Sequence, residues 1–371
     1  MSKYQLVTLG NHIDILSGFA FPSSGFNRNN GVPLIRIRDI LSGKTETYYE
    51  GSYDLKYIIK KGDLLVGMDG DFNREYWKGT DALLNQRVCK ITSNPETLDK
   101  NFLYYFLQKE LDKIHATTDV VTVKHLSVKK IQDIKIKLPA LEEQKRIASI
   151  LAKVDGIRQK REQTIKLADD FLRATFLEMF GDPVENPKGW QRMKFSEVGT
   201  LDRGKSKHRP RNAPELLGGI HPLIQTGDVA NSGGYITDYF STYSDIGLAQ
   251  SKMWKKGTLC ITIAANIAKT GILTFDACFP DSVVGFQPNQ HVEIEFIQHW
   301  LGFLQKQLEE TAPEVAQKNI NLAILRDLDV IVPDKALQMK FKGVVKKVRE
   351  LKEKYHNFPD IQPVLSSFHL S

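Results

Sequence analysis

The chain carries the same series of segments twice, and this repeat limits the folds open to it. Near the start, LVTLGNHIDILSG is followed by GVPLIRIRDILSG, and from Gln191 onward QRMKFSEVGTLDRG is followed by GIHPLIQTGDVANSGG. The offset between the copies grows from 186 residues (Gly18 to Gly204) to 194 residues (Pro139 to Pro333), as insertions confined to loops would produce. Several segments matching in one order make chance similarity improbable, so we expect two copies of one structural unit.

The matched segments predict the elements of each unit. The runs YIIKKGDLLVGMDGD and MWKKGTLCITIAAN each place a Lys-Lys-Gly turn between two apolar stretches, which predicts a β-hairpin in each copy. FLYYFLQKELDKI and FIQHWLGFLQKQL have the apolar spacing of amphipathic helices. VTVKHLSVKKIQDIKIKLP and VAQKNINLAILRDLDVIVP close the two copies, with Lys124 aligned to Lys318. The repeat therefore predicts two mixed units of strands and helices.

A long charged helix is predicted after each unit. The first runs from Leu141 to about Phe180, roughly 60 Å at the rise of an α-helix, and the second begins near Asp334, with Pro359 and Pro363 interrupting its last turns. Each apolar stripe is too long for its own unit to cover. We therefore expect the two helices to pair as an antiparallel coiled coil. The alternative is that each helix packs only on its own unit.

These elements predict an α+β fold with a pseudo-twofold repeat. We expect two tandem mixed α/β domains at residues 1–139 and 182–333. The first long helix occupies residues 140–181, and the second helix with a C-terminal tail occupies residues 334–371.

The composition is that of a globular protein with a modest excess of positive charge. The net charge is +7 and the pI is about 9.0, which suits a polyanionic partner without proving one. Cys89, Cys260 and Cys278 lack the spacing of a disulfide framework or a zinc site, so we expect buried thiols in a reducing compartment. No secretory signal opens the chain and no apolar run is long enough to span a bilayer. We predict a cytoplasmic protein without membrane contact.

The stretch GTLDRGKS at residues 199–206 fits the phosphate-loop pattern G-x-x-x-x-G-K-[ST], so an ATPase has to be considered. A phosphate loop needs a buried strand before it and a helix after it. Here the preceding MKFSEV is too polar for a central parallel strand, and Pro210 and Pro214 forbid the helix. The first copy keeps the glycine as Gly18 but lacks the lysine and the hydroxyl. The ATPase is therefore the less favoured hypothesis.

Other catalytic motifs are absent from the sequence. There is no methyltransferase cofactor loop with an N-P-P-[YFW] run, no H-E-x-x-H, and no acidic pair followed by E-x-K. Asp69, Asp71 and Asn73 resemble a calcium loop, but the glycine is misplaced and the closing glutamate is missing. We therefore predict that this chain has no catalytic residue, cofactor site or metal site of its own.

Five cations follow one another between residues 203 and 214 with no acidic residue among them. They are Arg203, Lys205, Lys207, Arg209 and Arg211. Proline holds this stretch extended, so the sequence predicts a contact to nucleic-acid phosphates. The alternative is a solvated basic loop.

A second region interleaves cations with aromatic residues. In DFNREYWKGTDALLNQRVCK, the cations Arg74, Lys78 and Arg87 accompany Tyr76 and Trp77, a combination that suits base-edge and phosphate contacts. The competing interpretation is that the aromatic residues form a local hydrophobic cap.

Two further pairs of cations complete the candidates. Arg36 and Arg38 are predicted to share one strand face in LIRIRD, although a solvent-facing strand would look the same. Lys124 and Lys318 match between the copies and follow a β-rich turn in an otherwise apolar region. The predicted DNA-binding set is Arg36, Arg38, Arg74, Tyr76, Lys78, Arg87, Lys124, Lys205, Lys207, Arg209, Arg211 and Lys318.

Two such units, each followed by a long helix, resemble the specificity subunit of type I restriction-modification enzymes. The resemblance spans essentially the whole chain and is carried by KKGDLLVGMDGDFNREYWKG with ALLNQRVCK, by the joint LPALEEQKRIASILAKVD, and by MFGDPVENPKGW. It implies that each unit is a target-recognition domain reading one half of a split, asymmetric DNA site. It also implies that the paired helices fix the spacer between the halves.

The resemblance implies partners as well. Two modification subunits would dock on the helices, bring S-adenosylmethionine and methylate an adenine flipped out of each half-site of double-stranded DNA. Restriction subunits would supply translocation and cleavage driven by ATP and magnesium. The remaining hypothesis, a free-standing sequence-specific DNA-binding regulator, would bind its site tightly without these partners.

Overall fold

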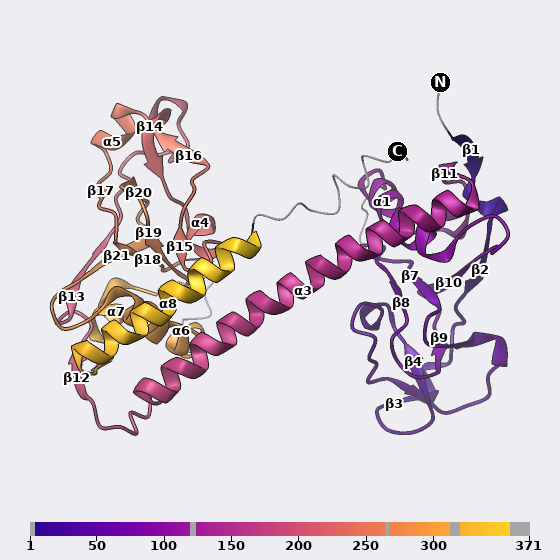
Figure 1. Ribbon diagram of the computed structural model, residues 1–371, viewed down its shortest axis with the longest axis horizontal. Helices are drawn as coiled ribbons and strands as arrows, with labels where there is room; N and C mark the ends of the chain where they lie inside the picture. Colours follow the sequence, from indigo (N-terminus) through magenta and orange to yellow (C-terminus); the bar gives the residue numbers. More distant parts are fainter. Residues whose placement is uncertain (1–3, 119–123, 265–266, 312–319, 357–371) are drawn as a thin grey trace. The chain divides into compact units, whose positions relative to one another are not determined.

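The computed structural model describes residues 4–118, 124–264, 267–311 and 320–356 (Figure 1). The chain divides into two compact units, and the division falls between Arg161 and Glu162, inside the longest helix. Each unit therefore takes one part of this helix into its own core.

The first unit contains a four-stranded antiparallel sheet in the order β2-β10-β7-β8, a mixed five-stranded sheet β3-β5-β4-β9-β6, and the two-stranded pair β1-β11. Its strands are β1 (Gln5–Thr8), β2 (Ile13–Ser17), β3 (Phe26–Asn27), β4 (Val32–Ile35), β5 (Tyr48–Tyr49), β6 (Ile58–Ile59), β7 (Leu64–Gly67), β8 (Arg74–Tyr76), β9 (Ala82–Leu84), β10 (Val88–Ser93) and β11 (Lys135–Leu138). Its helices are α1 (Lys100–Ala116), α2 (Val128–Gln132), the first part of α3 (Leu141–Phe180), and the short 3-10 turns Leu9–Asn11, Ser23–Gly25, Ile37–Asp39 and Leu55–Tyr57.

The second unit repeats this plan with sheets β13-β21-β18-β19-β15, β16-β14-β20-β17 and β12-β22. Its strands are β12 (Gln191–Lys194), β13 (Gly199–Arg203), β14 (Leu217–Leu223), β15 (Tyr235–Ile236), β16 (Ser241–Tyr243), β17 (Met253–Trp254), β18 (Leu259–Thr262), β19 (Thr270–Leu273), β20 (Ala277–Cys278), β21 (Val283–Pro288) and β22 (Asp329–Val332). Its helices are α4 (Thr226–Ala230), α5 (Asp245–Ala249), α6 (Ile294–Thr311), α7 (Leu322–Asp327), α8 (Lys335–His356) and the 3-10 turn Pro214–Leu216. The predicted α+β fold of two tandem mixed units is confirmed.

A buried glutamine shows how closely the two units correspond. Gln144 in α3 donates to the carbonyl oxygens of Thr97 and Pro139, both at 2.9 Å, and accepts from the backbone N–H of Asp99 at 2.9 Å. Gln338 in α8 makes the same three bonds, 194 residues later in each case. Its partners are His291 (3.0 Å), Pro333 (2.8 Å) and Glu293 (2.8 Å).

This glutamine clamp ties each long helix to the segment that enters the shorter helix α1 or α6. Both glutamines are buried, at 1% and 0% exposure, so their amide groups have no water to replace these partners. The repeat read from the sequence therefore extends to individual hydrogen bonds.

The predicted hairpins at the Lys-Lys-Gly turns are wrong in both units. The strand before each turn pairs elsewhere, β6 with β9 and β17 with β20, while β7 and β18 belong to the other large sheet. The turns themselves form as expected, with Gly62 and Gly257 in the left-handed region at φ +92° and +88°. Turn signals are local, whereas strand pairing is decided by distant partners, and here each turn forms a corner between two sheets.

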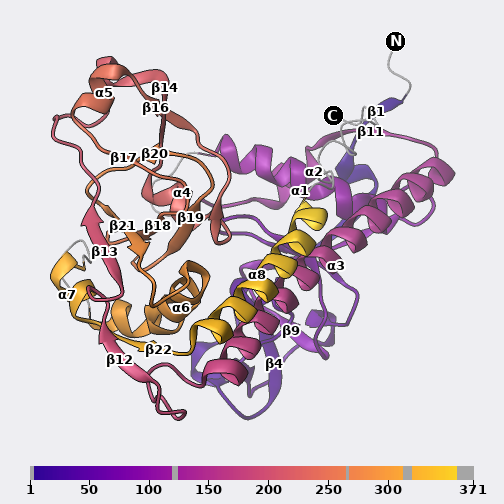
Figure 2. The ribbon, with the colours of Figure 1, turned by 60° about the vertical axis from the view of Figure 1, so that its left-hand side comes forward.

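The two long helices run antiparallel within the second unit, where α8 lies beside the last turns of α3 (Figure 2). The ring of Phe176 in α3 lies 5.5 Å from that of Phe341 in α8, and Asp169 forms an ion pair with Lys352. Residue 176 meets 341 and residue 169 meets 352, so the chain directions are opposed. The predicted antiparallel pairing is confirmed over this stretch. The predicted interruption at Pro359 and Pro363 lies outside the described residues.

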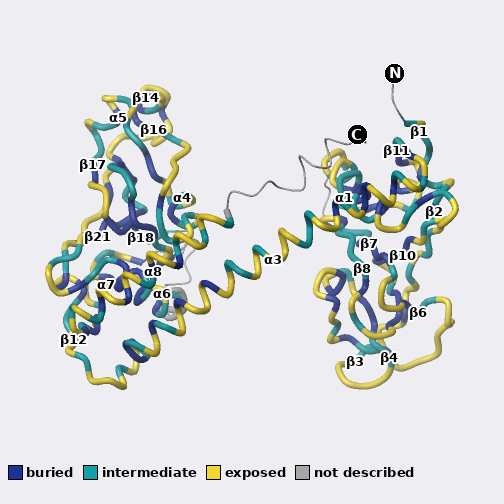
Figure 3. The backbone as a smooth tube through the Cα atoms, in the orientation of Figure 1, coloured by how far each residue is buried: buried dark blue, intermediate teal, exposed yellow. Residues whose placement is uncertain are grey.

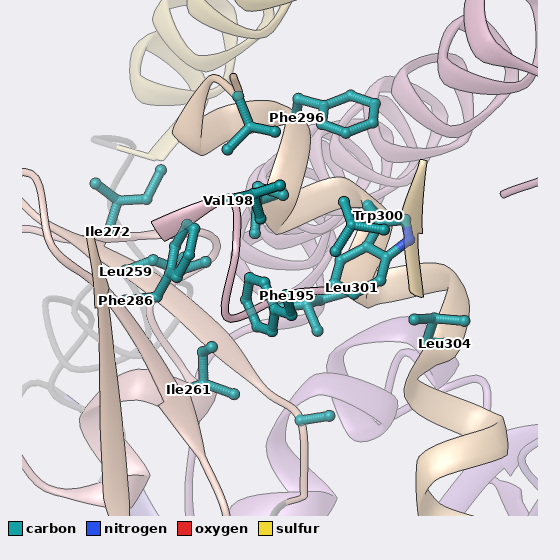
Figure 4. Packing of buried hydrophobic residues seen from close by; sticks show 14 of the residues in the cluster. Phe195, Val198, Leu259, Ile261, Ile272, Phe286, Phe296, Trp300, Leu301 and Leu304 are labelled. Carbon is teal, nitrogen blue, oxygen red and sulfur yellow. The ribbon is translucent and has the colours of Figure 1, made fainter. Parts of the chain in front are cut away.

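Each unit has its own core. In the second, Phe195 packs between the rings of Phe286 and Trp300, at 4.6 and 5.3 Å, where sheet and α6 meet (Figure 4). In the first, Ile147 and Leu151 of α3 belong to one buried cluster with Leu103 and Leu107 of α1. Figure 3 shows the exposed stretches that recur along α3. Further along α3, Ala168, Leu172, Phe176 and Phe180 are buried in the core of the second unit, and the other faces of the helix are largely exposed.

The three cysteines are buried and unpaired, as expected. Burial raises the pKa of the Cys89 thiol to about 12 and also raises the pKa values of Cys260 and Cys278. These thiols stay protonated and serve the packing of the sheets.

Candidate nucleic-acid interface

A glycine ends the first strand of the main sheet in both units. Gly18 and Gly204 donate to the carbonyl oxygens of Val88 and Val283, both at 2.9 Å. A Cβ at Gly18 would lie 1.9 Å from the carbonyl oxygen of Asn85, and one at Gly204 would lie 2.3 Å from that of Phe279. Only glycine allows this approach, which brings the chain leaving the sheet against the turn before β10 or β21.

This corner explains the phosphate-loop match. Residues Gly199–Arg203 form strand β13, and Gly204 is the close-packed corner residue. The next helical element is the three-residue 3-10 turn Pro214–Leu216, whereas a phosphate loop leads directly into a helix. The glycines of GTLDRGKS are therefore used for strand pairing and packing.

The basic loop after Gly204 is organised by one carboxylate. Asp281, in the turn between β20 and β21, lies with Oδ1 at 2.5 Å from Nη2 of Arg211 and with Oδ2 at 3.5 Å from Nη2 of Arg209. Its backbone carbonyl accepts from Nε of Arg203 at 2.9 Å. Three of the five cations predicted from the sequence therefore converge on this residue.

The lysines of the basic loop differ from its arginines. Lys205 and Lys207 are exposed, and no carboxylate of the described residues pairs with either ammonium group. Their backbone is anchored: Ser251 donates to the Lys205 carbonyl at 2.8 Å, and the Gln250 side chain accepts from the Lys207 N–H at 2.6 Å. The loop thus presents unpaired positive charge from a fixed protein backbone, which suits contact with the phosphates of DNA.

The corresponding corner of the first unit carries a smaller charged cluster. Oδ2 of Asp69 lies 3.3 Å from Nε of Arg87, and Oδ1 of Asp69 accepts a hydrogen bond from Nδ1 of His125 at 2.6 Å. Arg87 and His125 are more than half exposed. Lys124, next to His125, donates to the carbonyl oxygen of His115 at the end of α1 at 2.6 Å.

Two of the other candidates in this unit pack on α1. The guanidinium of Arg74 lies 3.5 Å from the ring centre of Tyr104, and the ring of Tyr76 stacks on Tyr104 at 4.8 Å. Burial raises the pKa of Tyr76, and raises that of Tyr104 to about 12, so both hydroxyl groups remain donors. Lys78 is largely exposed and pairs with Glu75 at 3.3 Å.

The hydrophobic interpretation holds for Trp77. Its side chain is 2% exposed and lies in a core cluster with Ile35 and Ile40, and its indole N–H donates to the carbonyl oxygen of Thr80 at 2.7 Å. Trp77 therefore supports the sheet from inside.

Arg36 and Arg38 do not share a strand face, which corrects the sequence expectation. Strand β4 ends at Ile35, and the backbone N–H of Arg36, the residue that caps the 3-10 turn Ile37–Asp39, donates to the Asp39 carboxylate at 2.8 Å. The second unit repeats this cap, with Asp228 accepting from the backbone of Gln225 at 2.7 Å. The acidic residue three positions on ends the strand early.

No group of three or more His, Cys, Asp or Glu side chains in the described ranges is arranged to hold a metal ion. None of the helices in those ranges combines the length and apolar character of a membrane-spanning helix.

Comparison with known proteins identifies the family. The model described as the type I restriction modification DNA specificity domain matches residues 1–167 and 187–350. The chain belongs to the type I restriction-modification DNA specificity family. It is 33% identical over 359 residues to the type I restriction enzyme EcoBI specificity subunit of Escherichia coli, a match that covers 88% of this chain and 75% of that one.

One further specificity subunit matches in sequence, and one solved structure matches in fold. The MjaVIII specificity subunit of Methanocaldococcus jannaschii is 26% identical over 160 residues, 40% of this chain and 38% of that protein. The crystal structure of the type I restriction-modification S subunit from M. genitalium has the same fold, with a TM-score of 0.61 at 15% identity, covering 98% of this chain and 93% of that one. The resemblance seen in the sequence is confirmed, and the role of this chain is DNA sequence specificity.

Sequence reasoning missed the residues that arrange the cations. Asp281 and Gln250 are 70 and 43 residues away from the Arg211 and Lys207 groups that they contact, so no local pattern reports them. The alignment of Gly18 with Gly204 was the available signal. In the structure Gly204 packs against the turn before β21, and this turn carries Asp281. Lys318 lies outside the described residues. DNA contact by the remaining predicted residues stays a prediction.

Proposed function

We propose that each unit reads one half of a bipartite, gapped DNA site within a type I restriction-modification complex. The observation that carries this proposal is the duplicated match to a DNA specificity domain, at residues 1–167 and 187–350. Each matched stretch has its own exposed cations at the glycine corner, Arg87 in the first unit and the basic loop in the second. Two different sets of contacts would read an asymmetric site.

Helix α3 would set the distance between the two half-sites. It is one continuous helix of 40 residues, about 60 Å at 1.5 Å per residue, and its two parts belong to different cores. Two readers joined by a continuous helix select half-sites at one spacing, as paired readers do on other operators.

The helices would also dock the modification subunits. Leu167 and Phe171 on α3 are 59% and 55% exposed although α8 packs nearby, and apolar side chains grouped on a surface favour protein contacts. Two modification subunits would bring S-adenosylmethionine and methylate one adenine in each half-site. Restriction subunits would add ATP- and magnesium-dependent translocation and cleavage. This chain would supply recognition and no catalytic group.

Co-expression with the neighbouring modification subunit tests the proposal. Methylated adenines would be mapped across the host genome with both proteins present, and with the modification subunit alone as control. We expect a two-part motif with a fixed gap that disappears when this chain is omitted. An assembled complex that adds no methylation would contradict the proposal. Tight binding of a defined site by the chain without partners would then favour the free-standing regulator.

A further inference from the structure

We propose that Asp281 is a positioning residue for DNA recognition by the second unit. It would hold the guanidinium groups of Arg209 and Arg211 in the orientation in which they meet DNA. The inference rests on the proposed function and deepens it, because it names the acidic residue on which recognition by one unit depends.

The contacts at Asp281 are shared between two arginines. Oδ1 receives Nη2 of Arg211 at 2.5 Å and Oδ2 faces Nη2 of Arg209 at 3.5 Å, so the two guanidinium groups are tied to one carboxylate. The two arginine side chains are 46% and 55% exposed, and that of Asp281 is 33% exposed. Ion pairs this accessible contribute little to folding, so stability alone does not explain the cluster.

The backbone that carries Asp281 is itself fixed. The turn that carries Asp281 is closed by the bond from Val283 N–H to the Pro280 carbonyl at 3.0 Å. Gly204 passes so close to this turn that a Cβ would lie 2.3 Å from the Pro280 carbonyl oxygen. On the other side of the basic loop, Gln250 accepts from the backbone of His208 at 3.1 Å. The arginines therefore start from a fixed loop and end on a fixed acid.

A fixed guanidinium is suited to reading DNA. Each guanidinium has five N–H donors, and Asp281 takes one from each arginine. Nη1 of Arg209 also donates to the carbonyl oxygens of Ser206 at 2.5 Å and His208 at 2.8 Å, which fixes this side chain further. The donors that remain, above all those of Arg211, can meet phosphate oxygens or the acceptors of a guanine. Holding the side chains before binding reduces the conformational entropy lost in the complex. An arginine without such a partner would have to be ordered by DNA alone.

A rival explanation predicts the opposite sign. If Asp281 only offset the charge of the basic loop, its removal would raise the local positive charge and strengthen binding to DNA. If it positions the arginines, the same removal weakens binding to the recognised site although the charge is more favourable. The direction of the change therefore separates the two explanations.

The experiment uses the complete chain assembled with its modification subunit. Binding of a duplex carrying the mapped motif, and of duplexes with one or the other half scrambled, is measured by fluorescence anisotropy at several salt concentrations. The variants are Asp281→Asn, which keeps the shape of the side chain, and Glu215→Gln, a matched control. Glu215 lies beside the same loop, 3.8 Å from His208, and does not contact either arginine. Thermal melting checks that each variant is folded.

We expect Asp281→Asn to weaken binding of the motif duplex about tenfold and to remove discrimination at one half-site only. The slope of log affinity against log salt should become shallower by about 1–2, because up to two phosphate contacts are lost. Glu215→Gln should bind the motif duplex at least as tightly as the wild type. If Asp281→Asn did not fold, Arg211→Lys would decide, since it keeps the charge but loses the planar fork.

Unchanged or tighter binding of the motif by Asp281→Asn, or unchanged motif binding by Arg211→Lys if that variant is needed, would overturn the inference alone. A wild-type complex that recognises no gapped motif would overturn the proposed function and this inference with it.

Discussion

At the glycine corner the two units take their carboxylate and their cations from opposite segments. In the first unit, the turn before β10 supplies the cation, Arg87, and the acid, Asp69, comes from the loop after β7. In the second, the corresponding turn supplies the acid, Asp281, and the cations come from the loop after Gly204. The same meeting point of backbone segments therefore carries differently arranged charges.

Away from this corner the units correspond bond by bond. Their outermost strands pair in the same register, Gln5 with Leu138 and Gln191 with Val332, and the same glutamine clamp closes each helix joint. Buried groups allow few alternatives, whereas exposed loops can change without disturbing the core. A duplicated scaffold can thus carry two unlike recognition surfaces.

The largest difference in stability between the two units is expected from a change at Phe176. This side chain is fully buried among the rings of Phe180, Phe296 and Phe341, where α3 meets α8. We expect Phe176→Ala to destabilise the second unit by about 3–5 kcal/mol through loss of burial and formation of a cavity. Hydrogen exchange should accelerate in α8 and leave α1 unchanged.

Leu151 supplies the matching variant in the first unit, where it is 1% exposed in the α3–α1 core. Leu151→Ala should cost about 2–5 kcal/mol and accelerate exchange in α1 instead. Equal acceleration in α1 and α8 for either variant would show that the units unfold together, and the comparison of two independent cores would fail.

The glutamine clamps should give effects of equal size in the two units. Gln144→Ala and Gln338→Ala each leave a backbone N–H and two carbonyl groups without their partner, at a cost of about 2–3 kcal/mol. Urea unfolding followed by unit-specific hydrogen exchange would measure both. Gln159→Ala is the control, since this glutamine is exposed and its amide donates to Asp155 within the same helix. A large loss of stability for only one of the two variants would show that the two glutamine clamps are not equivalent.

What could be predicted from the sequence follows the same division between buried and exposed parts. The repeat predicted two units and the antiparallel helices because their apolar positions, glycines and prolines recur in order. The Lys-Lys-Gly hairpins failed because the pairing partners, β9 and β20, lie far along the chain. Arg36 and Arg38 were placed on a strand because alternation gave no sign of the Asp39 cap.

The candidate site was predicted in composition but not in arrangement. The basic loop was evident as a run of cations, whereas its partner Asp281 is 70 residues from Arg211 and appears only once β13 pairs with β21. Aromatic residues near cations were ambiguous in the sequence. The structure places Trp77 in the core and Tyr76 against α1.

Docking of modification subunits should be weakened by changes that leave both cores intact. Replacing Leu167 and Phe171 together by Ser removes exposed apolar surface from α3, and we expect about tenfold weaker association with the modification subunit. Analytical ultracentrifugation of the co-purified proteins would measure it. Leu55→Ser in the first unit is the control, because Leu55 is 73% exposed and belongs to the 3-10 turn Leu55–Tyr57, not to α3 or α8. Equal losses for both variants would speak against a helix-specific surface.

The smallest effects are expected at the exposed cations, and they test whether the two corners read separate half-sites. Lys205→Ala combined with Lys207→Ala removes two exposed lysine charges from the second unit, while Arg87→Ala removes from the first unit an exposed charge that is paired with Asp69. Affinity for the motif duplex should fall a few-fold, and the salt slope should become shallower by about 2 and about 1 respectively.

Each of these variants should relax the sequence requirement for methylation in a different half of the motif, because each charge belongs to one unit. Lys255→Ala provides the control: this lysine is exposed, pairs with Asp276 and lies outside the basic loop. Unchanged salt slopes for the loop variants would show that the lysines do not contact phosphates, and would favour the alternative of a solvated basic loop. If a single variant relaxed the sequence requirement in both halves, the two units would not read the DNA independently. An independent reader cannot alter the specificity for the half that the other unit binds.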